Sequence, residues 1–396
     1  MNATTSLQPS ARRIATIDVM RAIIMFLMLF VNDIPGVKDL PHWIGHAETE
    51  EDMLGFSDIV FPGFLFCVGM SIPFAIKSRF NRGDSVLGVM RHVVSRSAAL
   101  IVMGLFTLNG CKTGLSMLLV VSAFFLIWLN YAKGPEVLKG WPSALLRCIG
   151  AAILLGIMIY QDATGEPFRT RWWGILGLIG WAYLVSAMLY LLTRSSLRHT
   201  LCAWGVVIAL CVVNAQGGFI PEEYFSRNIF LPFWPGGWTH PALVMSGMVA
   251  SLLLTRMVKN GQQRRIFPTF IAMAAVSGAL TLASHHFWII SKDLATPTWL
   301  FICLMIFFIA TPCIHWLTDV KGKASWFAII APAGTATLTC YALPYFWYAL
   351  KQMCEFHLLP VEWNHGLVGI AESIVFALII IQITRLLLKA KLQLKV

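Results

Sequence analysis

The sequence carries little charge for its length. Only 12% of its 396 residues are Asp, Glu, Lys or Arg, whereas 58% are hydrophobic, and its mean hydropathy is +0.72. Soluble proteins contain about 25% charged residues, so this composition excludes a soluble globular protein and predicts a chain that crosses a membrane several times. The net charge of +11 does not indicate a nucleic-acid partner, because the basic residues are sorted by membrane side, as described below.

Several common motifs are also missing. No Cys and His residues have a spacing typical of zinc, and the sequence has neither a Gly-x-Ser-x-Gly element nor a Gly-rich phosphate loop, so we predict no metal site. The first apolar run lacks a small-residue cleavage site, which favours a retained helix over a signal peptide. Seven of the nine cysteines fall in or near apolar runs, where Cys behaves as a small hydrophobe, and we predict no disulfide.

Long apolar segments predict an all-α bundle of about twelve transmembrane helices, treated as one domain over residues 1–396. Each segment has about the twenty residues that a bilayer requires. The third and fourth are separated only by residues 109–114, so eleven spans is the alternative. The predicted spans are 14–35, 55–77, 91–109, 114–130, 142–160, 172–193, 198–216, 239–257, 266–285, 297–316, 325–350 and 367–388.

The basic residues predict the orientation of the chain. If the N-terminus is inside, the inner segments hold twenty-two Lys and Arg residues and the outer segments hold seven. Because cytoplasmic loops are enriched in Lys and Arg, both termini are predicted to be cytoplasmic. The longest outer segment, 216–238, is rich in Pro and aromatic residues, and is predicted to be either a lid over the outer mouth or an interfacial aromatic belt.

The polar groups of the apolar helices gather in residues 14–77, a predicted hairpin of two spans. One group lies at its inner end. Asp18 and Arg21 are three residues apart, so they share a helix face and can simply pair with each other. The functional alternative is a binding site for a cytosolic donor that includes Asp18, in which Arg21, with Arg79 and Arg82, receives the phosphates. An ionisable group inside a membrane span is costly, so the cluster requires one of these explanations.

The outer end of the same hairpin carries a second group of polar residues. Asn32 and Asp33 end the first predicted span, His42 and His46 lie in the outer loop, and Asp58 opens the second span. The Asn32 amide could donate to a developing oxyanion, whereas Asp33 is expected either to shape a turn or to contact substrate. Loop histidines are usually only solvated, and Asp58 could only cap its helix. If the loop folds inward, however, Asp58 would orient an imidazole as a base.

Distance along the first helix relates the two polar groups. Eleven residues separate Arg21 from Asn32, which is about 17 Å and close to three turns, so the two side chains are expected to face one channel. A pantetheine arm has about that reach.

Elsewhere, His240 is a candidate substrate contact on the outer side. Glu372 lies within the last span, where it pairs with a cation such as His365 or forms a proton or ion site.

At these residues the chain resembles a known family. Its first hairpin is similar to the first two spans of the heparan-alpha-glucosaminide N-acetyltransferase family and its bacterial relatives, through the segments RIATIDVMRAIIMFLMLFVND and SDIVFPGFLFCVGMSIPFAI and the acid-rich loop after His46 and Ala47. The likeness continues more thinly through RWWGILGLIGWAYL, LPFWPGGW and KDLATPTW. The resemblance implies a transmembrane enzyme that moves acetyl from cytosolic acetyl-CoA to an amino sugar or glycan across the membrane.

The same resemblance implies roles for individual residues. It matches His46 to the active-site histidine, with Asn32 and Asp58 as its partners. Two departures stand out: the spacing from His46 to Asp58 is slightly longer, which leaves His42 as an alternative base, and residues 177–178, Gly-Leu, replace a Gln-Arg pair. The family's large luminal domain does not precede the first span, so heparan sulfate is not fixed as the acceptor. The relatives further imply a bacterial inner membrane, contact with membrane lipid, and a homodimer.

A secondary transporter is the competing interpretation. Twelve spans with both termini inside are common in transporters, and Asp18, Asp58 and Glu372 could carry protons or ions. The clustering of ionisable groups at the ends of one hairpin, away from the bilayer midplane, favours the enzyme. N- and O-acetylation both remain open, as do direct transfer and an acetyl-histidine intermediate.

Overall fold

The described part of the chain folds almost entirely into helices, which confirms the predicted all-α class. The structure is a computed structural model that describes residues 14–165, 167–170, 172–193, 195–215, 237–354 and 364–396. Over these ranges there is no strand beyond two isolated bridges, Lys38 with His365 and Leu129 with Leu394. The longer helices are α1 (Ala15–Asp33), α2 (Ser57–Phe80), α3 (Val86–Gly110), α4 (Gly114–Trp128), α5 (Trp141–Ala163), α6 (Gly174–Leu192), α7 (Leu197–Val213), α9 (Thr239–Lys259), α10 (Gln263–His285), α11 (Pro297–His315), α12 (Ala331–Thr335), α13 (Thr337–Cys354) and α14 (Gly366–Lys389). Short turns are η1 (Ile34–Gly36), η2 (His42–Ile44), η3 (Glu136–Leu138), the π-helix η4 (Trp316–Val320) and η5 (Ala324–Phe327).

Among the described helices, nine are long and apolar enough to cross a membrane. They are α1 with η1, α2, α3, α5, α6, α9, α10, α11 with η4, and α14. Helices α4 and α7 are also apolar but have only 15 and 17 residues. The segment predicted as one span at 325–350 is instead divided into η5, α12 and α13, because the chain leaves helical geometry at Ala336. The predicted lid or aromatic belt lies, through residue 236, outside the described residues.

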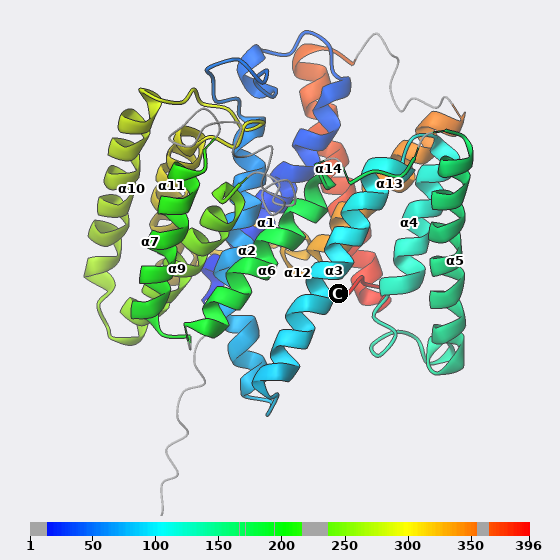
Figure 1. Cartoon of the computed structure of the whole chain (residues 1–396), viewed down its shortest axis with the longest axis horizontal. Coiled ribbons are helices and arrows are strands. Elements are labelled where there is room, and N and C mark those ends of the chain that lie inside the picture. Colours follow the sequence, from blue (N-terminus) through cyan, green and yellow to red (C-terminus); the bar gives the residue numbers. More distant parts are fainter. Residues whose placement is uncertain (1–13, 166, 171, 194, 216–236, 355–363) are drawn as a thin grey trace, which may run out of the picture.

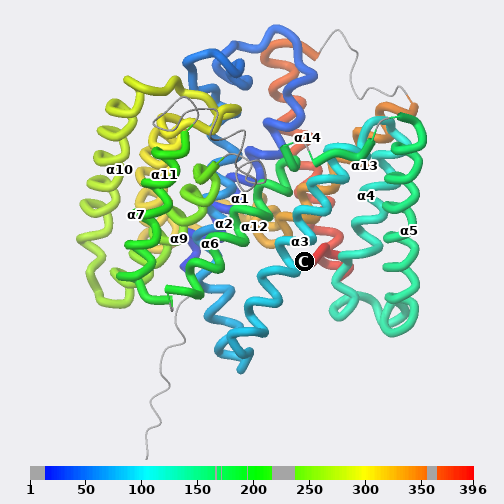
Figure 2. The backbone as a smooth tube through the Cα atoms, viewed as in Figure 1, coloured from blue at the N-terminus to red at the C-terminus, as the bar shows by residue number. Residues whose placement is uncertain are grey.

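Helix α1 runs through the interior of the bundle and contacts α2, α11, α12, α13 and α14. In Figure 1, helices α7, α9, α10 and α11 form one flank of the molecule and α4, α5 and α13 the other. Figure 2 follows the chain from α1 into the outer loop and back down α2, and the α2–α3 turn lies at the opposite end of the bundle from that loop. Fully buried Met25 and Leu29 of α1 and Leu65 and Phe66 of α2 belong to one continuous core. The predicted catalytic hairpin is therefore central to the fold.

The start of α1 is fixed by a residue from η4. Ile14, which precedes the helix, provides no side-chain cap. Asp319 accepts hydrogen bonds from the backbone N–H groups of Ala15, at 2.8 Å, and Thr16, at 2.9 Å. A carboxylate at a helix N-terminus satisfies unpaired donors and interacts favourably with the helix dipole. The N-terminal end of α1 is thus held at the end of α11.

Glycines allow the central helices to pack backbone against backbone. A Cβ on Gly69 of α2 would lie 1.8 Å from the carbonyl oxygen of Val244, and one on Gly247 of α9 would lie 1.9 Å from that of Phe66. Close approach at small residues is a usual way for helices to associate in membranes. Gly104 of α3 serves the same purpose, because a Cβ there would lie 2.2 Å from the backbone nitrogen of Gly177 in α6.

The α2–α9 crossing yields a stability prediction. We expect Gly69→Ala and Gly247→Ala to lower the free energy of unfolding by about 1–3 kcal/mol or more, because overpacking forces the two backbones apart. The measurement is the thermal denaturation midpoint of the purified protein in detergent. Gly205→Ala in α7 is the matched control, because no atom lies within 4 Å of its Cβ position. Equal midpoints for Gly69→Ala and Gly205→Ala would contradict the packing argument.

Candidate active site

The outer loop between α1 and α2 folds down onto the first turn of α2. The Phe56 N–H donates to the Trp43 carbonyl at 2.7 Å, and the Ser57 hydroxyl donates to the Ile44 carbonyl at 2.7 Å. Gly55 is required in this arrangement, because a Cβ there would lie 2.3 Å from the Gly45 carbonyl oxygen. These contacts bring the residues after η2 beside the N-terminus of α2.

His46 and Asp58 form a hydrogen-bonded pair at this point. His46 Nδ1 lies 2.6 Å from Asp58 Oδ1. The Asp58 side chain is only 3% exposed, whereas that of His46 is 46% exposed. Oδ2 of Asp58 accepts from the backbone N–H groups of Ala47, at 3.0 Å, and Gly55, at 3.2 Å. The carboxylate is therefore fixed, and an Nδ1–H that donates to it leaves Nε2 as the unprotonated, outward nitrogen of a neutral imidazole.

A buried tryptophan at the start of α11 contacts the backbone of this pair. Trp299 is fully buried, and its indole N–H donates to the backbone carbonyl of Asp58 at 3.2 Å. A rigid aromatic beneath the first turn of α2 limits the movement of that turn.

Lys292 is a third charged member of this cluster, and sequence reasoning missed it. Its Nζ lies 3.0 Å from His46 Nδ1 and 3.3 Å from Asp58 Oδ1. Lys292 belongs to the loop between α10 and α11, at the same end of the bundle as the outer loop (Figure 1). Two signals could have identified it. It is one of seven basic residues in the predicted outer segments, and it begins the KDLATPTW motif.

The two loops are joined by further polar contacts. Asp52 accepts from the Ile290 N–H at 2.8 Å and contacts His285 Nε2 at 2.7 Å. The Ile290 N–H is the main cause that keeps the pKa of Asp52 below its ordinary value, and His285 adds to this effect. The Ser291 hydroxyl donates to the Thr49 carbonyl at 3.0 Å. The loop that carries Lys292 is therefore bound to the loop that carries His46.

The two candidate histidines of the outer loop have different surroundings. His42 is exposed, and its Nε2 lies 2.7 Å from Glu51 Oε1. The pKa of His42 is raised, mainly by this hydrogen bond. Between His42 and His46, the structure brings only His46 to Asp58.

Asn32 and Asp33 are separated by their surroundings. Asp33 accepts from the Ser373 hydroxyl at 2.8 Å and the Tyr348 hydroxyl at 3.2 Å, so it joins the end of α1 to α13 and α14. Asn32 is exposed, and no described residue hydrogen-bonds its amide. His240, the candidate substrate contact on the predicted outer side, is buried, with its ring packed edge-on against Phe61 at 5.5 Å between centroids.

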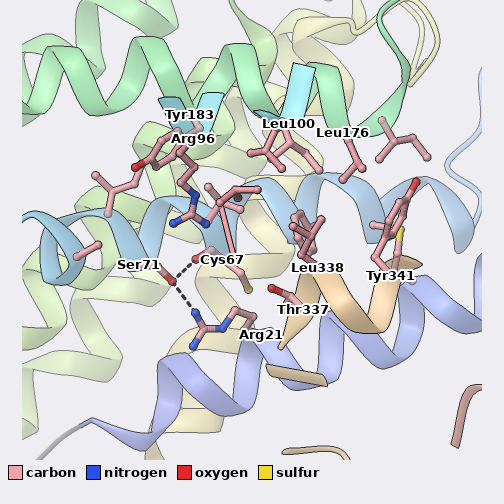
Figure 3. A pocket seen from close by; sticks show the side chains of 18 residues that line it. Arg21, Cys67, Ser71, Arg96, Leu100, Leu176, Tyr183, Thr337, Leu338 and Tyr341 are labelled. Atoms are coloured by element: carbon pink, nitrogen blue, oxygen red, sulfur yellow. Dashed lines mark hydrogen bonds between the residues drawn. The ribbon is translucent and has the colours of Figure 1, made fainter. Parts of the chain in front are cut away.

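Near the N-terminal end of α1, Arg21 faces a cavity (Figure 3). Arg21 pairs with Asp18 at 2.6 Å, as predicted, and its Nη1 donates to the Ser71 hydroxyl at 3.4 Å. The cavity has a volume of about 90 Å³, several times the ~10–15 Å³ that one water requires. Its wall includes Arg96 of α3, whose guanidinium lies 5.0 Å from the ring centroid of Tyr183.

Both cavity arginines have an unused donor. Nε of Arg21 and Nε of Arg96 are buried without a hydrogen-bond partner among the described residues. Buried polar groups are normally satisfied, so two unsatisfied donors beside one cavity suit a polar or anionic ligand. Arg79, by contrast, pairs with Asp84 at 2.8 Å, and neither it nor the exposed Arg82 lines the cavity.

The cavity and the cluster of His46, Asp58 and Lys292 lie along the same two helices. The cavity follows α1 from Arg21 to Met28, and Asn32 is one turn, about 6 Å, beyond Met28 on the same face. On α2 the cavity reaches Phe64, and Asp58 is six residues, about 9 Å, beyond it. The cavity thus points along α1 and α2 toward the His46–Asp58 pair.

Comparison with known proteins shows a partial similarity to two N-acetyltransferases and a match to one family model. Residues of this chain match the heparan-alpha-glucosaminide N-acetyltransferase of Mus musculus at 34% identity over 100 residues, or 25% of this chain and 14% of that protein. The Homo sapiens protein of the same name is 33% identical over 108 residues, or 27% of this chain and 15% of its own length. The chain therefore covers only about one seventh of each relative. The model of a family described as "Domain of unknown function (DUF5009)" matches residues 13–232, more than half of the 396 residues, and the chain belongs to this family.

Proposed function

We propose that the protein is a transmembrane acetyltransferase that moves acetyl from cytosolic acetyl-CoA to an amino sugar or other glycan on the outer side. The observation that carries this proposal is the His46–Asp58 pair, a half-exposed imidazole held by a buried carboxylate at 2.6 Å. A fixed carboxylate and an imidazole with one free nitrogen form a general-base arrangement. The partial similarity to two N-acetyltransferases supports acetyl as the group transferred.

The proposed topology has twelve spans and both termini in the cytoplasm. It adds α4, α7 and the divided segment of η5, α12 and α13 to the nine long apolar helices. The distribution of basic residues, twenty-two inside against seven outside, supports this orientation. We place the protein in a bacterial inner membrane, in contact with lipid and as a homodimer, on the basis of family resemblance.

In this scheme acetyl-CoA is a substrate that enters from the inner side. Arg21, which Asp18 orients, receives its phosphates together with Arg79 and Arg82 nearer the surface. The cavity adds Arg96 to the residues predicted from the sequence, because its Nε is an unused buried donor. The pantetheine arm then follows α1 past Met28 toward Asn32, so that the thioester arrives at the outer end. Positioning of this kind supplies much of the rate in transfer reactions.

Acetyl transfer then proceeds within residues 14–77. His46 Nε2 removes a proton from the acceptor amine or hydroxyl, and the nitrogen or oxygen attacks the thioester carbon. The Asn32 amide donates to the resulting oxyanion, and collapse of the intermediate breaks the C–S bond, with the proton passing to the CoA thiolate. Asp58 keeps the imidazole oriented. In the alternative route, His46 Nε2 attacks first and carries the acetyl group transiently.

The two routes differ in covalent labelling. With radioactive acetyl-CoA and no acceptor, the acetyl-histidine route leaves label on the protein that His46→Ala abolishes. Direct transfer leaves none.

His46 provides the direct test of the proposal. We expect His46→Ala to lower acetyl transfer from acetyl-CoA to glucosamine by about 10²- to 10⁴-fold, the range typical of a lost general base. The measurement uses the purified protein in detergent, which opens both sides to reactants. His42→Ala is the matched control, because His42 contacts Glu51 and not Asp58, and it should retain activity. Full activity in His46→Ala would refute the assignment.

The inner cavity gives a separate prediction for the donor. We expect acetyl-CoA to raise the thermal denaturation midpoint of the protein, because a ligand that binds the folded state stabilises it. Arg21→Ala should reduce this stabilisation and raise the KM for acetyl-CoA about tenfold, whereas Arg91→Ala, on the exposed surface of α3, should change neither. No stabilisation by acetyl-CoA, together with uptake of a solute driven by a pH gradient in proteoliposomes, would favour the ion-coupled transporter instead.

A further inference from the structure

We propose that Lys292 is a positioning residue that shares the Asp58 carboxylate with His46 and thereby keeps the imidazole unprotonated and ready to act as a base. The inference deepens the proposed function, and its importance for catalysis rests on that function. The arrangement itself stands on the positions of three charged or titratable groups from three different segments of the chain.

The distances define how the carboxylate is shared. His46 Nδ1 lies 2.6 Å from Asp58 Oδ1, and Lys292 Nζ lies 3.3 Å from the same oxygen. Nζ is also 3.0 Å from Nδ1, so the three atoms form a triangle. A protonated Nδ1 that donates to Asp58 has no lone pair with which to accept a hydrogen bond from Lys292. Both nitrogens therefore serve as donors to one carboxylate oxygen, while Oδ2 is occupied by two backbone N–H groups.

Electrostatics gives this triangle its consequence. A buried carboxylate alone beside an imidazole favours the imidazolium, because the opposite charge stabilises it. A protonated His46 has no free nitrogen with which to accept a proton. The ammonium of Lys292 opposes this effect, since it neutralises Asp58 and repels a second positive charge 3.0 Å away. Lys292 thus allows Asp58 to orient His46 without protonating it.

The other charged groups around His46 are already engaged. Asp293, on the same loop as Lys292, lies 3.4 Å from its Nζ and accepts from the Thr49 hydroxyl at 3.0 Å. On the loop of His46 itself, Glu51 contacts His42 and Asp52 contacts His285. Asp39, Glu48 and Glu50 are the remaining acids of this loop, and all three are exposed. Asp58 from α2 and Lys292 from the α10–α11 loop are therefore the charges in direct contact with the imidazole.

The backbone around Lys292 is held on both sides. Ser291, which precedes it, donates to the Thr49 carbonyl, and Asp293, which follows it, accepts from the Thr49 hydroxyl. Thr296 then caps the start of α11 by accepting from the Trp299 N–H at 3.3 Å. Because both neighbours of Lys292 contact the same residue of the His46 loop, the ammonium is aimed at the pair and is 23% exposed. The fold places this lysine specifically.

The test measures the protonation of His46 without any turnover. Diethyl pyrocarbonate modifies only the unprotonated imidazole. The modification rate of the half-exposed His46, measured against pH, therefore gives the pH at which His46 is half protonated. Fragment ions in mass spectrometry distinguish modified His46 from modified His42. In the full-length protein in detergent, we expect Lys292→Met and Lys292→Gln to raise this midpoint by about one pH unit or more, a tenfold change in the protonation equilibrium. Lys292→Arg, which keeps the charge, should remain near the wild-type value.

Lys38→Met is the matched control, because it removes an exposed lysine from the loop that carries His46. It should leave the midpoint of His46 unchanged. An unshifted midpoint in either neutral Lys292 variant would overturn the inference. Activity gives a second readout: the acid limb of kcat/KM should move upward in Lys292→Met, with activity recovered at higher pH, whereas a purely structural role would lower activity at every pH. A shifted midpoint in a protein without acetyl transfer would preserve the role of Lys292 and refute the proposed function.

Discussion

The burial of the Asp58 carboxylate is the constraint on which the packing of the loops around the start of α2 depends. A buried charge is costly unless it is paired and hydrogen-bonded, and Asp58 obtains its partners from three segments. His46 and Ala47 come from the outer loop, Gly55 from the approach to α2, and Lys292 from the loop before α11. Satisfying one carboxylate therefore requires two distant loops to fold over the start of α2, and the same contacts fix the imidazole.

Helix α11 aligns helices α1 and α2, which form the proposed catalytic hairpin. At its start, Trp299 donates to the backbone of Asp58, which fixes the outer end of α2. Beyond its end, Asp319 accepts from the first N–H groups of α1, which fixes the inner end of that helix. Because α1 and α2 are both held against one helix, the axial offset between Arg21 and the His46 pair is set by rigid elements. In the proposed reaction this offset determines how far the donor must reach.

Local spacing predicted only part of the site. Asp18 and Arg21 pair as their three-residue separation indicated, because neighbours on one helix face need no tertiary contact to meet. Pairing of His46 with Asp58 was expected only if the loop folded inward, which the sequence alone could not determine. Lys292 was counted as an outer charge and its partners were missed, since it lies 246 positions from His46. Arg96 was likewise read only as an inner charge.

The sequence by itself determined the membrane class, the all-α fold and the positions of most helices, because the length of an apolar run is a local property that the bilayer selects directly. The division of the segment at 325–350 into three pieces and the burial of His240 were decided by packing between helices. Packing likewise decided that His46, Asp58 and Lys292 come together. Which polar groups meet depends on contacts between residues far apart in the chain, and such contacts are set only when glycine-packed helices and hydrogen-bonded loops bring them together.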